Sequence, residues 1–233
     1  MFKQMFDKES STHTYLIADE NSREAVLIDP VVTHVEDYIS MLNTHNLTLK
    51  YSLETHVHAD HITASGILRE QMEVQTGVSE RCGATTADIQ LNDGDVLTVG
   101  DQKIYVIATP GHTAGSVSFL CQDRLFTGDT LLINGCGRTD FQSGSSEELY
   151  DSIYNKIFTL ADETLIYPGH DYNGRRVSNV GQEKTTNTRL ANKTREQFIE
   201  IMDKLDLPKP KLIDIAVPAN RKCGVQDLDI VQG

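Results

Sequence analysis

The chain has 233 residues, of which 39% are hydrophobic and 24% are charged, an ordinary composition for a soluble globular protein. Its formal net charge of −13 argues against nucleic acid as a partner, because phosphates require a basic protein surface. No apolar run reaches the roughly 18 residues needed to cross a membrane, and the N-terminus lacks a secretory or transit pattern. We therefore expect a cytoplasmic protein with no membrane partner.

The first third of the chain alternates strand-like and helix-like segments. Short apolar runs bounded by turn-forming residues predict strands at 14–17 and 25–28. Apolar residues at helical spacing predict a helix over 34–46. A third strand, 49–55, leads directly into a cluster of histidines, and a second helix is expected over 62–72.

The rest of the chain is first rich in strands and then helical. Turn signals at Asp93-Gly94 and Gly100-Asp101 separate the expected strands, which are 96–99, 103–107, 116–120, 124–127 and 164–167. A helix over 146–160 is expected to begin with Ser146 as its cap, and another over 194–205 is expected to end before Pro208 and Pro210. This order predicts two sheets packed face to face with helices outside. Because no linker is visible, we expect a single domain, 1–233, with its C-terminal segment 206–233 packed on it.

The most informative segment is Thr55-His56-Val57-His58-Ala59-Asp60-His61, just past an expected strand. Imidazole nitrogens and carboxylate oxygens are the side-chain ligands that suit zinc, iron and manganese. The alternative is a surface loop that happens to be polar, but this density of ligand types favours a metal site.

Three further strand ends carry the same kinds of side chain. His112 lies in Thr109-Pro110-Gly111-His112-Thr113, Asp129 in Phe126-Thr127-Gly128-Asp129, and His170 in Tyr167-Pro168-Gly169-His170-Asp171. Each fragment alone is a common turn. Their order along the chain, each after a strand and downstream of the histidine cluster, indicates one site.

Taken together, His56-Val57-His58-Ala59-Asp60-His61, His112, Asp129 and His170 resemble the metal-binding pattern of the metallo-β-lactamase superfamily. The resemblance covers nearly the whole chain and implies an α/β fold, an αββα sandwich with its metal at the edge between two mixed sheets. It is less specific for chemistry, because hydrolases and oxidoreductases share this fold.

A second set of segments resembles the persulfide dioxygenases, the ethylmalonic-encephalopathy protein family. These segments are Gly135-Cys136-Gly137-Arg138-Thr139-Asp140-Phe141-Gln142, His61-Ile62-Thr63, Gly169-His170-Asp171-Tyr172, Leu207-Pro208-Lys209-Pro210 and Val217-Pro218-Ala219-Asn220. The resemblance implies one Fe(II) per chain, held by His56, His112 and Asp129. Its implied reaction oxidises glutathione persulfide with O₂ and water to sulfite and glutathione. It also implies a homodimer, with a rhodanese or a sulfide:quinone oxidoreductase as a possible partner in the same pathway.

The same resemblance suggests roles for the remaining polar residues. His58, Asp60, His61 and His170 would orient the ligands or, alternatively, hold a second metal. Arg138, Tyr172 and His170 are the candidate catalytic residues, and Arg138, Tyr172 and Arg189 are the candidate substrate contacts. A surface role is the alternative for each arginine and a half-buried role for Tyr172.

The strongest rival interpretation is glyoxalase II, which hydrolyses a glutathione thioester with two metals, zinc or a mixed pair. In that arrangement His56, His58 and His112 hold one ion, Asp60, His61 and His170 the other, and Asp129 bridges them. A non-catalytic metal-binding module is disfavoured, because no ligand is missing.

Away from these motifs, His13, His34 and His45 are expected to be exposed or to cap helices. The widely spaced Cys82, Cys121, Cys136 and Cys223 indicate reduced thiols, with Cys136 either a small buried residue or one near the site.

Overall fold

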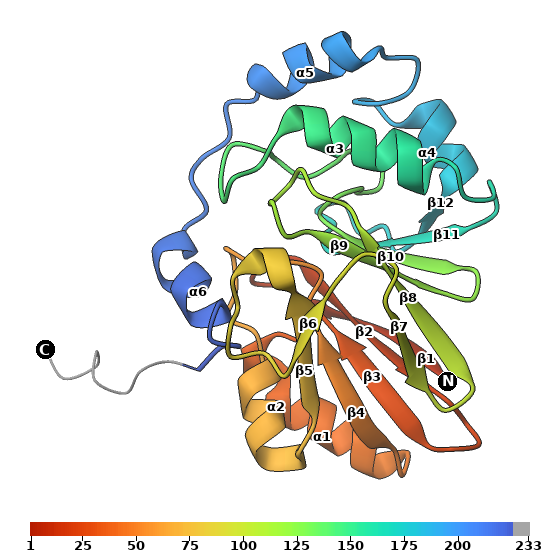
Figure 1. Ribbon diagram of the computed structural model, residues 1–233, viewed down its shortest axis with the longest axis vertical. Coiled ribbons are helices and arrows are strands. Elements are labelled where there is room, and N and C mark those ends of the chain that lie inside the picture. Colours follow the sequence, from red (N-terminus) through yellow and green to blue (C-terminus); the bar gives the residue numbers. More distant parts are fainter. Residues whose placement is uncertain (226–233) are drawn as a thin grey trace, which may run out of the picture.

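The computed structural model describes residues 1–225. Within this range, two six-stranded sheets pack face to face (Figure 1). The first sheet keeps its strands in chain order: β1 (Phe2–Asp7), β2 (Thr12–Ala18), β3 (Glu24–Ile28), β4 (Thr48–Leu53), β5 (Gln75–Ser79) and β6 (Ile89–Leu91). The second sheet also follows the chain: β7 (Val96–Val99), β8 (Gln102–Ala108), β9 (Val117–Cys121), β10 (Arg124–Gly128), β11 (Leu165–Pro168) and β12 (Ser178–Asn179).

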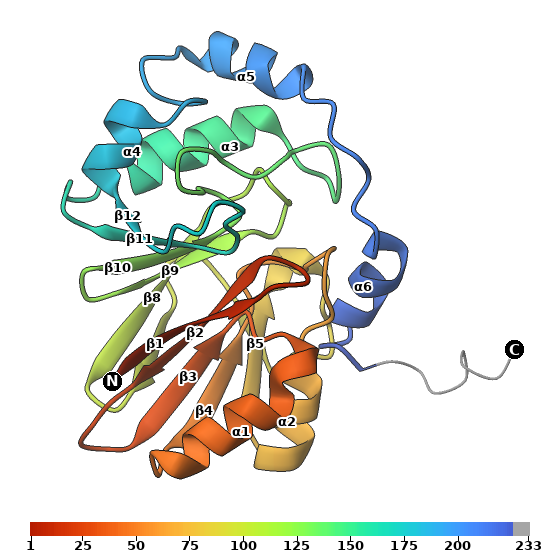
Figure 2. The same ribbon diagram turned by 180° about the vertical axis from the view of Figure 1, so that it is seen from behind.

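Helices cover the outer face of each sheet, so the molecule has four layers (Figures 1 and 2). Two helices lie on the first sheet, α1 (Val35–Thr44) and α2 (Ser65–Met72). Three lie beyond the second sheet, α3 (Ser146–Ser152), α4 (Val180–Thr186) and α5 (Arg195–Asp203). The last helix, α6 (Ile213–Asn220), lies beside the loops at one end of the sandwich. The predicted αββα arrangement is therefore confirmed.

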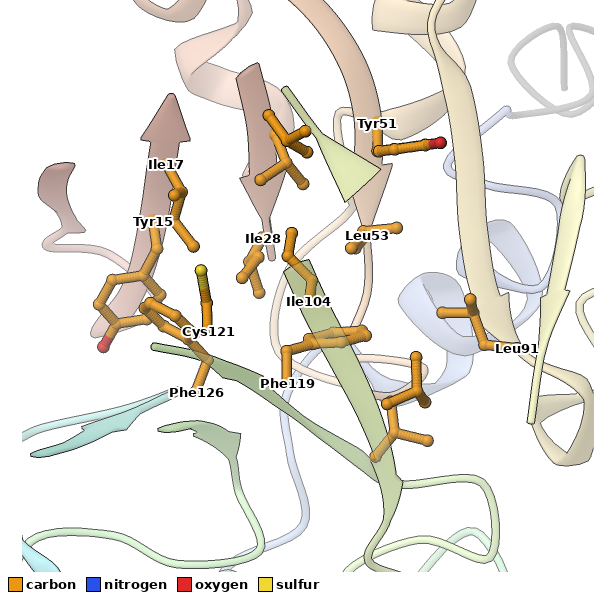
Figure 3. Packing of buried hydrophobic residues seen from close by; sticks show 14 of the residues in the cluster. Tyr15, Ile17, Ile28, Tyr51, Leu53, Leu91, Ile104, Phe119, Cys121 and Phe126 are labelled. Atoms are coloured by element: carbon orange, nitrogen blue, oxygen red, sulfur yellow. The ribbon is translucent and has the colours of Figure 1, made fainter. Parts of the chain in front are cut away.

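The alternation of side chains along β2 shows how the layers are held together. Tyr15 and Ile17 point into the core between the sheets, where the Tyr15 ring packs on Phe126 of the second sheet with centroids 4.9 Å apart (Figure 3). Leu16 points the other way, into the cluster beneath α1 that contains Leu42. Successive side chains of a strand alternate between faces, and β2 is buried on both. Each large apolar side chain buried this way contributes about 1.5–3 kcal/mol.

The start of α3 differs from the prediction. Ser145, not Ser146, is the N-cap: its Oγ accepts a hydrogen bond of 3.2 Å from the backbone N–H of Glu148, while Ser146 is already helical. The helix expected over 146–160 also changes geometry, since α3 passes into a π-helical turn at Ile153–Ile157. The N-cap and the first helical residue are distinguished by their backbone angles. Because Ser145 and Ser146 are the same residue type, the sequence alone does not show which of them is the cap.

Several elements were not predicted from the sequence: β1, β5, β6, β12, α4 and α6. β1 is partly exposed and mixes polar with apolar residues, and α6 contains Pro218. α2 begins at Ser65, later than predicted, because the Ile62 carbonyl accepts from the Val32 N–H (2.9 Å) and the Gly66 N–H donates to the Cys223 carbonyl (2.7 Å), so the first helical bond between them is not made.

Part of the predicted C-terminal segment, residues 226–233, lies outside the described residues. Within residues 1–225, no helix is long and apolar enough to cross a membrane. All four cysteines are buried free thiols. His13, expected to be exposed or capping, is instead buried at 3% exposure, because it is the second residue of β2 and its N–H donates to the Gly169 carbonyl beside His170.

Candidate metal centre

The four strand ends that carry the candidate ligands meet at one edge of the sandwich. In the second sheet β9 is antiparallel to both β8 and β10, and β10 is parallel to β11, so β8, β10 and β11 end at the same edge. The loop after β4 brings the first-sheet histidines to this edge. As a result, the ligand atoms of His56, His112 and Asp129 lie within 4.8 Å of one another.

Both histidines of this group present the same ring nitrogen to the site. Thr55 Oγ1 donates to Asp29 Oδ2 (2.8 Å), so it accepts from His56 Nδ1–H at 3.0 Å. His112 Nδ1–H donates to the backbone carbonyl of Arg138 (2.7 Å). These bonds fix the tautomer and leave a lone pair on each Nε2, as a metal ligand requires. Burial lowers the pKa of His56 well below its usual value, which keeps that ring neutral.

Asp129 completes the group as a carboxylate. Its Oδ1 accepts a hydrogen bond of 2.6 Å from His170 Nδ1, and its Oδ2 lies 3.6 Å from His112 Nε2. Burial alone would raise the pKa of Asp129, but the charge and hydrogen bond of His170 hold it below the usual range. Two imidazoles and one carboxylate, each anchored from behind, fit a divalent transition metal with positions left for other ligands.

His58 lies beside His56, with ring centroids 4.1 Å apart, but its Nε2 points to two carboxylates. Its Nε2 lies 3.1 Å from Asp29 Oδ1 and 3.2 Å from Glu54 Oε2, and all three side chains are buried. Burial disfavours the charged ring, but the two carboxylates raise the pKa of His58 to about 10. Glu54 also accepts hydrogen bonds from the hydroxyls of Thr63 and Ser65. His58 therefore anchors the histidine loop to the first sheet.

The remaining polar residues of the motif form a second, adjacent cluster. Asp60 Oδ2 lies 3.0 Å from His61 Nδ1 and 3.0 Å from His170 Nε2. The far nitrogens of the loop histidines, His58 Nδ1 and His61 Nε2, are buried without a hydrogen-bond partner among the described residues.

A side chain of α6 holds the histidine loop from the outside. Asn220 is 4% exposed, and its Nδ2 donates to the carbonyls of His58 (2.9 Å) and His61 (2.8 Å) while its Oδ1 accepts from the Thr63 N–H. The C-terminal segment thus contributes directly to the shape of the loop.

We expect Asn220→Ala to destabilise the protein by about 1–3 kcal/mol, because it leaves a buried N–H and two carbonyls unsatisfied. That cost corresponds to a fall of roughly 2–12 °C in melting temperature, measured by scanning calorimetry. Asn43→Ala, on the exposed face of α1, is the matched control. Equal melting of the two variants would contradict this role of Asn220.

A cavity of about 470 Å³ opens beside the ligand group, a size typical of small-molecule sites. His56, His112, Asp129, Asp60 and His170 line it, together with Cys136, Arg138, Tyr172, Arg189, Leu207, Pro208 and Pro210. The structure therefore brings the predicted substrate residues together with the predicted ligands, while His58 and His61 lie behind the cavity wall.

Arg138 connects two walls of the cavity. Its Nε and Nη2 donate to the carboxylate of Asp140, both at 2.6 Å, and its Nη1 donates to the carbonyl of Pro208 (2.7 Å). Its guanidinium also stacks on Phe141, 4.7 Å from the ring centroid. Most of its donors are thus used within the protein, so Arg138 positions the segment that contains Pro208.

The side chains of Arg189 and Tyr172 form fewer hydrogen bonds within the described part of the protein than that of Arg138. Arg189 lies between α4 and α5, not on a helix surface, and its Nη1 donates to the Cys136 carbonyl at 2.7 Å. No carboxylate among the described residues forms an ion pair with it. Tyr172 is 71% exposed, and its ring lies parallel to His170 with centroids 6.1 Å apart.

Comparison with known proteins agrees with this geometry. The family model of the metallo-beta-lactamase superfamily matches residues 7–81 and 82–170. The bovine protein "Persulfide dioxygenase ETHE1, mitochondrial" is 49% identical over 228 residues, which cover 97% of this chain and 89% of the relative. The chain belongs to the persulfide dioxygenase family.

A solved structure of the same family is also very similar. ETHE1 from Myxococcus xanthus is 56% identical with a TM-score of 0.95, and the match covers 97% of this chain and all of that one. A hydroxyacylglutathione hydrolase of Dictyostelium discoideum is 33% identical over 81% of this chain and 71% of its own length. The persulfide dioxygenases are thus more similar to this chain than that thioester hydrolase.

Sequence reasoning missed the residues that anchor the ligands from behind, namely Asp29, Glu54 and Thr12. Asp29 follows β3 in Ile28-Asp29-Pro30 and has a positive φ of 51°. An aspartate at a strand end, before proline, is the one signal that could have drawn attention to it. Thr12 and Glu54 carry no comparable local signal.

Proposed function

We propose that this protein is an Fe(II)-dependent dioxygenase that oxidises glutathione persulfide to sulfite and glutathione. One persulfide, one O₂ and one water give one thiol, one sulfite and two protons. The outer sulfur is oxidised, and O₂ accepts its electrons. Fe(II), held by His56, His112 and Asp129, supplies the redox chemistry when bound.

The observation that carries this proposal is the anchored set of two imidazoles and one carboxylate at the wall of an open cavity. His56 Nε2, His112 Nε2 and Asp129 Oδ2 are the only ring nitrogens and carboxylate oxygen of these residues left free by the hydrogen bonds of the described part. Three protein ligands leave room for substrate and O₂ side by side.

The residues of this chain bind and orient the substrate. Arg189, a cation without a carboxylate partner in residues 1–225, suits a glutathione carboxylate at the cavity wall. The exposed ring of Tyr172 offers an apolar face and a hydroxyl to the same molecule. Local cations of this kind explain how a chain of net charge −13 accepts an anion.

A thioester hydrolase of the glyoxalase II type is the second candidate. It is favoured by the two buried ring nitrogens without partners in residues 1–225, His58 Nδ1 and His61 Nε2, one available for each ion of that arrangement. It is disfavoured because both nitrogens of His170 and one oxygen of Asp60 already have protein partners.

The deciding experiment measures metal content and oxygen uptake on one preparation of the protein. About one iron per chain, with O₂ consumed and sulfite formed from glutathione persulfide, supports the dioxygenase. About two metals per chain, with cleavage of S-lactoylglutathione and no oxygen uptake, supports the hydrolase instead.

Arg138→Ala is expected to raise the persulfide concentration at half-maximal rate by about 10–100-fold, the loss for one or two hydrogen bonds to a charged group. The segment around Pro208 loses its attachment, whereas the metal stays because His112 is anchored by a backbone carbonyl. Oxygen-uptake kinetics with parallel metal analysis measure both quantities. Arg195→Ala removes an exposed pair with Asp151 and serves as control. A drop in metal content without a change in KM would refute this assignment.

A further inference from the structure

The hydroxyl of Thr12 lies at the centre of the second polar cluster. Its Oγ1 donates to Asp60 Oδ2 at 3.1 Å and lies 3.1 Å from His170 Nε2 and 3.3 Å from His61 Nδ1. Thr12 is fully buried. One hydroxyl thus contacts three side chains that come from two separate loops.

These three side chains are the ones that a two-metal arrangement would use for its second ion. Bonds from nitrogen or oxygen to a metal such as zinc are about 2.0–2.2 Å long, so Asp60, His61 and His170 would have to close around that ion. In the structure they surround the Thr12 oxygen instead. Residues 1–225 contain three groups of possible metal ligands: His56 with His112 and Asp129, His58 with Asp60 and His61, and Asp29 with Glu54 and His58. None of them unites Asp60, His61 and His170.

The backbone holds this hydroxyl firmly in place. Thr12 pairs with Asp7 in the ladder between β1 and β2, and it forms a bridge to His170. The neighbouring His13 N–H donates to the Gly169 carbonyl at 2.7 Å. Ser10 Oγ lies 2.7 Å from Thr12 Oγ1. The backbone at Thr12 is therefore fixed, and the contacts of its Oγ1 with Ser10, Asp60 and His170 hold the side chain in this rotamer.

From these contacts we propose that Thr12 is a positioning residue that limits the centre to one metal ion. Its hydroxyl lies between Asp60, His61 and His170 and engages Asp60 Oδ2 and His170 Nε2, two of the atoms that a second ion would need. The inference rests on the proposed function, because it explains how a chain with every ligand of a two-metal site is a one-metal enzyme. The Thr12 hydroxyl, through its contact with His170 Nε2, also keeps His170 Nδ1 directed at Asp129, one of the three ligands.

Removal of the hydroxyl should therefore create a second site. Thr12→Ala frees Asp60 Oδ2 and His170 Nε2 from one partner and opens space between them, and His61 Nε2 already lacks a partner. Thr12→Ser keeps the hydroxyl and loses only a methyl group, so it is the matched conservative variant.

The test counts metal ions per chain in the full-length protein, stripped of metal and titrated with Zn²⁺ or Mn²⁺. Wild type and Thr12→Ser are expected to bind about one ion, and Thr12→Ala about two. With Mn²⁺, paramagnetic resonance of Thr12→Ala should show a coupled pair of ions that the other two lack. One ion in a folded Thr12→Ala, or two in wild type, overturns the inference.

Two further measurements keep the outcomes distinct. If Thr12→Ala does not fold, Asp60→Asn decides: unchanged metal content supports the inference, and lost metal overturns it, because Asp60 would then be a ligand. Oxygen uptake by wild type tests the proposed function separately. Persulfide-dependent uptake with one ion in both wild type and Thr12→Ala overturns only the role of Thr12. A second ion in Thr12→Ala alone, without oxygen uptake by wild type, overturns only the dioxygenase.

Discussion

The His112→Ala variant is expected to lose its bound metal and its persulfide-dependent oxygen uptake together. His112 supplies one of three ligand atoms, and its ring is already oriented by the bond from Nδ1–H to the Arg138 carbonyl. Loss of residues that merely support a ligand weakens metal binding by about 10–100-fold, so loss of a ligand itself should exceed that range. Activity should fall to the level of the metal-free protein.

The measurement is metal content after dialysis, followed by oxygen uptake with added Fe(II). His45→Ala is the matched control, because His45 lies after α1, beside Leu47 and the N-terminus, and belongs to no strand end of the site. The control should keep metal and activity at wild-type levels. A His112→Ala protein that retains iron and consumes oxygen would refute the assignment of His56, His112 and Asp129 as the ligand set.

The fold could be predicted from the sequence where local pattern and burial agree. β2 and β3 are short apolar runs ended by turn-formers, and α1 shows helical spacing, so all three were predicted to within a few residues. β1 was missed because it mixes polar with apolar residues, and α6 because what holds it is distant in sequence. Met5 of β1 pairs with Thr14 across a hairpin, and Asn220 of α6 bonds to a loop about 160 residues away.

In the candidate site, too, local sequence pattern predicts some features, and contacts between distant parts of the chain decide the others. Histidine and aspartate at the ends of strands indicate ligands because metals need those few atom types. The atoms that decide which of them can bind a metal come from elsewhere in the chain: Asp29 contacts His58, Thr12 contacts Asp60 and His170, and a backbone carbonyl contacts His112. No local periodicity predicts such contacts, because they depend on how two sheets meet.

The structure changes the role that the sequence suggests for Arg138. The resemblance to the persulfide dioxygenases made it a candidate contact with substrate. In the structure it lines the cavity, yet four of its five N–H donors have partners within the protein. Its charge is offset by Asp140, so Arg189 is the freer cation for an incoming anion.

Asp29→Ala is expected to have the largest effect on stability of any single change at this site. Its carboxylate accepts the Thr55 N–H (2.7 Å) and the Thr55 hydroxyl (2.8 Å), and it contacts His58 Nε2 (3.1 Å). Removal leaves a buried N–H without an acceptor and a buried histidine with Glu54 alone. Loss of one partner of a buried ion pair costs about 3–5 kcal/mol, which corresponds to a fall of roughly 6–20 °C in melting temperature.

The same change should weaken metal binding by about 10–100-fold, because His56 is oriented through Thr55 by Asp29. Calorimetry and metal titration of one preparation measure both effects. Asp29→Asn is the matched variant: asparagine tolerates the positive φ of this position and keeps an acceptor oxygen, but it loses the charge. Asp29→Asn should therefore retain more metal affinity than Asp29→Ala while still melting below wild type. If Asp29→Ala melted within about 2 °C of wild type, Asp29 would not be the anchor of the histidine loop.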